Sequence, residues 1–103
     1  RYEGRVEPID TVAGHIPGAH NTPMADYLEP DGRFLDRERL LAYFAARGVF
    51  DHGEVGTYCG SGITATHLAL ALRRIGVNAA VYVGSWSEWI TDPDRPIATG
   101  PDA

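Results

Sequence analysis

Apolar residues recur at helical spacing in two stretches of the chain. The first covers residues 37–47, where leucine, phenylalanine and alanine alternate with arginine and glutamate. Asp36 stands just before it and is the expected N-cap, because its carboxylate can accept hydrogen bonds from the unpaired N–H groups of a first turn. Gly48 is placed to end the helix. The apolar stripe is expected to consist of Leu40, Leu41, Phe44, Ala45 and Gly48.

A second helical pattern covers residues 64–75, and Gly76 follows it as a stop signal. Its apolar residues again fall three and four positions apart, so they share one face of the helix. We expect this face to lie in the core. It consists of Ala65, Leu68, Ala69, Leu72 and Ile75.

Two short runs flank the second helix and predict β-strands. Residues 54–58 precede it and residues 79–83 (AAVYV) follow it. A strand–helix–strand succession almost always places its two strands parallel in one sheet. The second run is apolar throughout, which predicts a strand covered on both faces. A further short strand is expected at residues 19–22, after a Pro-Gly turn signal.

The segment GSWSEW, residues 84–89, predicts one more short helix. Ser85 and Glu88 stand three positions apart, which is the spacing of a capping box and makes Ser85 the expected start. Trp86 and Trp89 are expected to pack together into the core, as paired aromatic rings usually do. Trp86 could also flank the mouth of a site.

Composition narrows the class of protein. The 103 residues suffice for one domain, and 44% hydrophobic with 22% charged residues is typical of globular chains. A net charge of -5 without a Lys/Arg cluster argues against nucleic-acid binding. No apolar stretch approaches the ~20 residues of a membrane-spanning helix, so no membrane partner is expected. A single cysteine excludes an internal disulfide, so a cytoplasmic location is expected.

Four histidines could suggest a metal site, but their spacing does not support one. His15 and His20 lie in one Gly/Pro-rich segment without a third ligand at a suitable distance. We expect no bound metal, and we expect His15 to bond to the backbone in a tight loop. His52 and His67 are expected at the surface.

The only cysteine lies in the segment YCGSGITAT, residues 58–66. Cys59 follows a predicted strand and precedes a predicted helix, whose first N–H groups and dipole favour negative charge. Gly60 and Gly62 let the backbone curl around the sulfur, and Ser61 and Thr64 add hydroxyl donors. Such a setting lowers the pKa of a thiol and produces a nucleophilic thiolate. The alternative is a small buried structural thiol, which gains nothing evident from these neighbours.

A cysteine phosphatase also uses a strand–loop–helix cradle, but it needs an arginine six residues after the cysteine to grip phosphate. That position is Ala65, and residues 59–64 contain no cation. Tyr58 also stands where such loops often carry histidine. A phosphatase is therefore the less favoured interpretation.

Three segments together resemble one family. GHIPGAHN (residues 14–21), CGSGIT (59–64) and GSWSEW (84–89) occur in this order. The chain is similar to the rhodanese superfamily, in particular to the catalytic C-terminal domain of two-domain sulfurtransferases. The resemblance implies an α/β, three-layer domain with a parallel sheet flanked by helices. It also implies that Cys59 takes up a sulfane sulfur as a persulfide and passes it to a thiol or cyanide, without a cofactor.

The residues around the cysteine separate the subfamilies. A CGSGxT loop looks like that of 3-mercaptopyruvate sulfurtransferases, whereas thiosulfate sulfurtransferases more often have a cationic Cys-Arg-Lys-Gly loop. Thiosulfate is the second donor considered. The resemblance makes Ser61 a second catalytic residue in a proton relay. It matches Arg1 to the arginine that binds the substrate carboxylate, while a second such arginine is absent. The other substrate-binding positions it implies are Gly60, Ser61, Gly62, Ile63 and Thr64.

The resemblance also bears on domain organisation. The family places a central strand just before Arg1 and a non-catalytic rhodanese-like domain before that strand. We therefore expect residues 1–100 to be an N-terminally truncated catalytic domain lacking its first strand, with 101–103 as a tail. An N-terminal rhodanese-like domain of a parent chain is the expected partner, besides the sulfur donor and acceptor. A non-catalytic binding module on the same fold is the main alternative.

Overall fold

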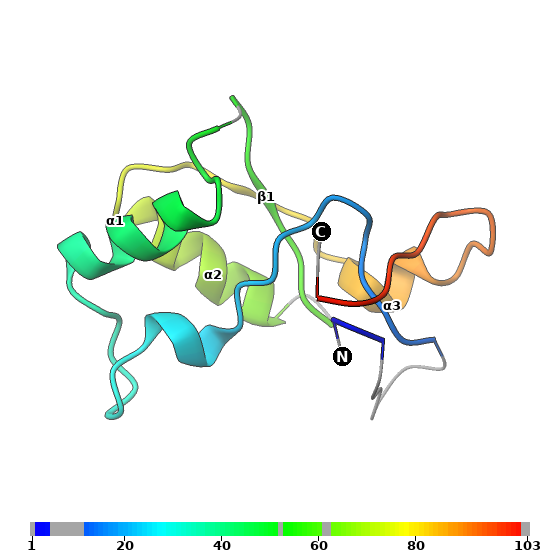
Figure 1. Ribbon diagram of the computed structural model, residues 1–103, viewed down its shortest axis with the longest axis horizontal. Coiled ribbons are helices and arrows are strands. Elements are labelled where there is room, and N and C mark those ends of the chain that lie inside the picture. Colours follow the sequence, from blue (N-terminus) through cyan, green and yellow to red (C-terminus); the bar gives the residue numbers. More distant parts are fainter. Residues whose placement is uncertain (1, 5–11, 52, 61–62, 102–103) are drawn as a thin grey trace.

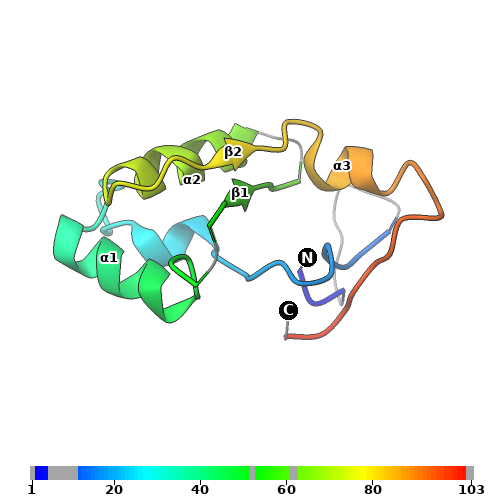
Figure 2. The ribbon, with the colours of Figure 1, turned by 90° about the horizontal axis from the view of Figure 1, so that it is seen from above.

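A computed structural model describes residues 2–4, 12–51, 53–60 and 63–101. The elements follow in the order η1 (Met24–Tyr27, a 3-10 turn), α1 (Arg37–Ala46), β1 (Gly56–Thr57), α2 (Ile63–Arg73), β2 (Ala80–Val81) and α3 (Ser85–Trp89). In both views α1 and α2 lie at one end of the molecule and α3 lies at the other (Figure 1, Figure 2). The chain therefore has the predicted α/β composition, with a short sheet between helices.

Helix α1 begins and ends where its local sequence predicts. The Asp36 carboxylate accepts a hydrogen bond from the Arg39 N–H at 2.9 Å. This bond, together with the Arg39 guanidinium, holds the pKa of Asp36 below its ordinary value. Gly48 follows the helix with φ of +80°, a left-handed conformation that glycine adopts without steric cost. Leu40 and Phe44 are buried, whereas Leu41 and Ala45 of the predicted stripe are exposed.

The strand–helix–strand unit pairs as expected. Strands β1 and β2 are parallel, with Gly56 opposite Ala80 and Thr57 opposite Val81. Both strands are shorter than the predicted runs, and residues 19–22 form no strand. The prediction that residues 79–83 are covered on both faces is wrong, since Ala80 is exposed and Val83 is 72% exposed. In the described part of the chain β2 has only one strand neighbour, so an apolar sequence alone did not bury it.

The core lies between η1, α1 and α2. Phe44 packs edge-on against Tyr43, with ring centroids 5.1 Å apart, and contacts Tyr27 at 5.7 Å. Burying such large rings is the main stabilising contribution available to a small domain. Of the predicted α2 face, Ala65, Leu72 and Ile75 are buried. The buried cluster consists of Tyr27, Leu40, Phe44, Ala71, Leu72 and Ile75.

The two ends of the described chain lie against each other. His15 and Ala98 form an antiparallel bridge, with both N–H···O distances at 2.8 Å. Gly14, at φ of +131°, permits this approach, because a Cβ there would lie only 2.6 Å from the Ala98 carbonyl oxygen. The Gly100 N–H also donates to the Glu3 carbonyl at 2.7 Å. These contacts hold Glu3, Gly14 and His15 against the last described residues of the chain. No helix formed by the described residues is long and apolar enough to cross a membrane.

Candidate active site

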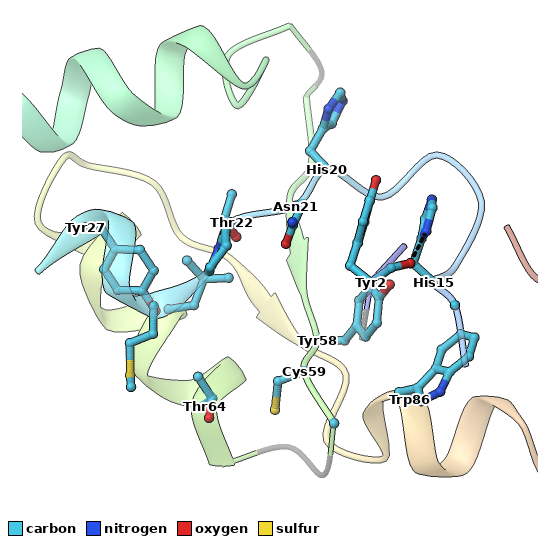
Figure 3. Close-up of a pocket in the computed structure, with 15 residues that line it drawn as sticks. Tyr2, His15, His20, Asn21, Thr22, Tyr27, Tyr58, Cys59, Thr64 and Trp86 are labelled. Carbon is cyan, nitrogen blue, oxygen red and sulfur yellow. Dashed lines mark hydrogen bonds between the residues drawn. The ribbon is translucent and has the colours of Figure 1, made fainter. Parts of the chain in front are cut away.

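Cys59 lies two residues beyond β1, where the chain turns toward α2. Buried Thr57 fixes this junction, because its hydroxyl donates to the Ala65 carbonyl in the first turn of α2 at 3.0 Å. The cysteine is half-buried and lines a cavity of about 320 Å³. Figure 3 shows its side chain on the same side of this cavity as Thr64, between Tyr27 and Trp86. We call this cavity the Cys59 pocket.

The start of α3 holds the cysteine loop through three hydrogen bonds. The Trp86 and Ser87 N–H groups donate to the carbonyls of Cys59 and Gly60, each at 2.9 Å. The Cys59 N–H donates to the Ser85 hydroxyl oxygen at 3.1 Å, and that oxygen lies 3.9 Å from the Cys59 sulfur. The loop that carries Cys59 is therefore aligned by a segment 26 residues further along the chain.

Helix α3 begins at Ser85 as predicted, but Ser85 does not act as its capping residue. Gly84 is the N-cap residue and no side chain caps the first turn. The Ser85 hydroxyl instead donates to the Tyr82 carbonyl at 2.8 Å and accepts from Cys59, and the residue is fully buried. Ser85 has φ of +53°, a conformation that costs energy for any residue with a side chain. Strain of this kind concentrates at functional sites, and here the hydroxyl bonds on both sides hold it in place.

Removing the Ser85 hydroxyl is expected to destabilise the domain. Ser85→Ala leaves the Cys59 N–H and the Tyr82 carbonyl without this buried partner, which costs about 1–3 kcal/mol of unfolding free energy. Urea denaturation measures the loss. Thr91→Ala is the matched control, because it removes an exposed hydroxyl that bonds the Glu88 carbonyl at 2.7 Å, and it is expected to change stability by under about 0.5 kcal/mol. Equal stabilities of the two variants would contradict the role assigned to Ser85.

His15 occupies a defined place at the pocket. Its ring stacks on Tyr2 with centroids 3.6 Å apart, and its Nδ1 lies 2.8 Å from the Tyr2 carbonyl oxygen. Since a carbonyl only accepts, Nδ1 is the donor in this bond. The predicted backbone bond of His15 is thus confirmed. Nε2 is buried and has no hydrogen-bond partner among the described residues.

Tyrosine hydroxyls give the pocket its polar character. The Tyr58 hydroxyl accepts from the Ile16 N–H at 2.9 Å, and burial raises its pKa. Burial raises the pKa of Tyr27 to about 12, with a smaller contribution from negative charge on Cys59. Both tyrosines therefore stay protonated near neutral pH. None of the described residues that line the pocket is Asp, Glu, Lys or Arg.

The predicted site residues are only partly described. Cys59, Gly60 and Thr64 line the pocket, and Ile63 begins α2. Arg1, Ser61 and Gly62 lie outside the described residues, as does His52. Trp86 lines the pocket as well as being buried, and its Nε1 donates to the Val12 carbonyl at 2.8 Å. The prediction that Trp89 lies in the core is wrong, because Trp89 is half-buried and its ring N–H donates to the Pro96 carbonyl.

Sequence patterns missed most of the pocket wall. His67, expected at the surface, is half-buried and packs against the rings of Tyr27 and Phe34. No three His, Cys, Asp or Glu side chains lie together as a metal site in the part of the chain that is described. The run HNTPMADY after GHIPGA was a usable signal, because it mixes polar and aromatic residues beside a family motif. The pocket residues that the sequence did not single out as site residues include Tyr2, Asn21, Thr22, Met24 and Tyr27.

Comparison with known proteins identifies the family. The model of the rhodanese-like domain matches residues 6–92, and the chain belongs to this family. It is 54% identical over 103 residues to a candidate 3-mercaptopyruvate sulfurtransferase of Pseudomonas aeruginosa. It is 49% identical over 100 residues to SseB, a candidate thiosulfate sulfurtransferase of Mycobacterium tuberculosis. These matches cover 97% of this chain but only 36% and 35% of the two relatives, so the chain spans about a third of their length.

A solved structure supports the fold and shows persulfide chemistry in a related protein. The chain superposes on EanB, in a form with a cysteine persulfide and ergothioneine, with a TM-score of 0.83 and 27% identity. The match covers 96% of this chain and 26% of EanB. The fold prediction is confirmed, and the named relatives are sulfurtransferases with two different sulfur donors.

Proposed function

We propose that this chain is the catalytic domain of a sulfurtransferase and that Cys59 carries the sulfur as a persulfide. The observation that carries this proposal is the position of the only cysteine. It stands between the end of β1 and the start of α2, half-buried in a pocket of hydroxyl groups, with its loop aligned by three bonds from α3. The sulfurtransferase names of the relatives support the same activity.

The reaction proceeds in two transfers. In the first, the Cys59 thiolate attacks the outer sulfur of the donor, an S–S bond forms, and the donor's bond to that sulfur breaks. The electron pair of the broken bond leaves with the donor, as sulfite from thiosulfate or as the enolate of pyruvate from 3-mercaptopyruvate. In the second, cyanide or a thiolate attacks the outer sulfur, and Cys59 returns as a thiolate. Cyanide leaves as thiocyanate.

The pocket favours 3-mercaptopyruvate over thiosulfate as the donor. Thiosulfate is a dianion and gains most from adjacent arginine or lysine, which the described lining lacks. Mercaptopyruvate carries one carboxylate and a keto oxygen, which neutral hydroxyl donors can hold. Ser61 as a relay residue, and Arg1 as the carboxylate ligand, remain predictions from the resemblance. The proposal includes a second rhodanese-like domain in the parent protein, since the relatives extend well beyond the matched part.

A steady-state assay tests the proposal. The chain is incubated with cyanide and either donor, and thiocyanate is measured. We expect thiocyanate from both donors, with the higher kcat/KM for 3-mercaptopyruvate. Thiocyanate from neither donor would contradict the sulfurtransferase function and favour a non-catalytic module. Hydrolysis of an aryl phosphate that requires Cys59 would point to a phosphatase.

A further inference from the structure

The Tyr27 hydroxyl is a buried donor without a partner. Tyr27 is fully buried, and no described group accepts a hydrogen bond from its phenol oxygen. An unmade hydrogen bond of this kind costs about 1–3 kcal/mol relative to a satisfied one. Phenylalanine would fill the same space in the core without that cost. The hydroxyl therefore calls for an explanation outside packing.

The phenol is held rigidly at the wall of the Cys59 pocket. Its ring packs against Phe34, Tyr43, Phe44 and His67, with centroid separations from 5.7 to 6.4 Å. Tyr27 lines the same pocket as Cys59 and Thr64, and Figure 3 shows its hydroxyl end directed to the side where Thr64 lies. Charge on Cys59 acts on this phenol, which places the two groups within electrostatic range. A neutral hydrogen-bond donor that is fixed in place and shielded from water can stabilise an oxygen atom that gains negative charge during a reaction.

We propose that Tyr27 is a specificity-determining residue that donates a hydrogen bond to the keto oxygen of a 2-oxo acid thiol such as 3-mercaptopyruvate. This inference rests on the proposed sulfurtransferase function and assigns a role within the same pocket. None of the described lining residues is Asp, Glu, Lys or Arg, so no carboxylate, ammonium or guanidinium group of this lining takes the role instead.

The chemistry explains why a donor at this oxygen matters. When the Cys59 thiolate bonds to the sulfur of 3-mercaptopyruvate, the carbon–sulfur bond breaks. Its electron pair stays on the three-carbon fragment, whose negative charge resides largely on the former keto oxygen. A proton from solvent then converts this enolate into pyruvate, and the transferred sulfur keeps its own proton or releases it to solvent. Sulfite leaving from thiosulfate develops no charge on a keto oxygen, so the Tyr27 bond contributes less to that reaction.

The test compares two donors in two phenol-to-phenyl variants of the whole chain. Tyr27→Phe removes the buried hydroxyl that has no hydrogen-bond partner among the described residues. Tyr43→Phe is the matched control from the same aromatic cluster. The Tyr43 hydroxyl lies outside the pocket lining and donates to the Asp26 carboxylate at 3.0 Å. The rate of sulfur loading on Cys59 is measured with 3-mercaptopyruvate and, separately, with thiosulfate. The melting temperature and the rate of alkylation of Cys59 by iodoacetamide report on the fold and on the thiol.

Tyr27→Phe is expected to slow loading from 3-mercaptopyruvate by about tenfold or more, with loading from thiosulfate changed by less than about threefold. Its melting temperature should not fall, and Tyr43→Phe should load normally from both donors. Unchanged loading in Tyr27→Phe, or an equal loss with both donors, would overturn the inference while leaving the sulfurtransferase function in place. A wild-type chain that loads from neither donor would instead overturn the proposed function, and this inference with it.

Discussion

Replacing Cys59 with serine is expected to reduce thiocyanate formation to the level of the uncatalysed reaction with either donor. Serine preserves the size and polarity of the side chain. Its hydroxyl, however, is not ionised near neutral pH and cannot hold a transferable sulfur. Because Cys59 is the only cysteine, no other thiol can substitute for it. The measurement is the steady-state rate with cyanide as the acceptor.

The control for this loss is a small single-residue change that lies away from the pocket. Thr91→Ala alters one exposed hydroxyl at the end of α3 and should retain the wild-type rate. Circular dichroism should show that Cys59→Ser is folded like the wild type. Residual thiocyanate formation well above background in folded Cys59→Ser would contradict the assignment of Cys59 as the sulfur carrier.

The largest loss of stability is expected from Phe44→Ala. Phe44 is only 2% exposed and contacts Tyr27 and Tyr43 in the core beneath the pocket. Truncating a buried phenylalanine removes its transfer free energy and leaves a cavity, at a cost of about 3–5 kcal/mol. Small domains have total free energies of unfolding of about 5–15 kcal/mol. A substantial fraction of Phe44→Ala molecules is therefore expected to be unfolded at 37 °C. Urea denaturation at 25 °C gives the change in unfolding free energy.

Phe50→Ala provides the matched comparison. Phe50 lies shortly after α1 and is 52% exposed, so its truncation should cost well under half as much as that of Phe44. Sulfur loading in Phe44→Ala should fall with the folded fraction, because η1 and α2 pack on this core and carry Tyr27 and Thr64. Equal costs for the two phenylalanines would show that the core is not where the structure places it.

Features decided by neighbouring residues were predictable from the sequence. The Asp36 cap, the stop at Gly48 and the start of α2 after the cysteine loop all depend on a few consecutive positions. The parallel pairing of β1 and β2 followed from the strand–helix–strand order. Cys59, Gly60 and Thr64 were predicted to lie together for the same reason, since the loop is one continuous segment, and all three line one pocket.

Features decided by distant contacts were not predictable. Ser85 has the spacing of a capping residue, yet its hydroxyl accepts a hydrogen bond from the amide of Cys59, 26 residues away in the sequence. Val83 belongs to an apolar run, yet it is 72% exposed. Tyr27 and His67 meet through the packing of η1 on α2, which no periodicity of either segment reveals. The sequence marks Cys59 as the candidate nucleophile, and the three-dimensional arrangement adds the residues that surround it.

The most direct test of the account is the intact mass of the chain after exposure to 3-mercaptopyruvate, and separately to thiosulfate, with Cys59→Ser treated in parallel. We predict a gain of one sulfur atom in the wild type that disappears on addition of cyanide and is absent from Cys59→Ser. Faster loading from 3-mercaptopyruvate would agree with a described pocket lining that contains no arginine or lysine. A well-folded wild-type chain that gains no sulfur from either donor would contradict the claim that Cys59 carries sulfur as a persulfide.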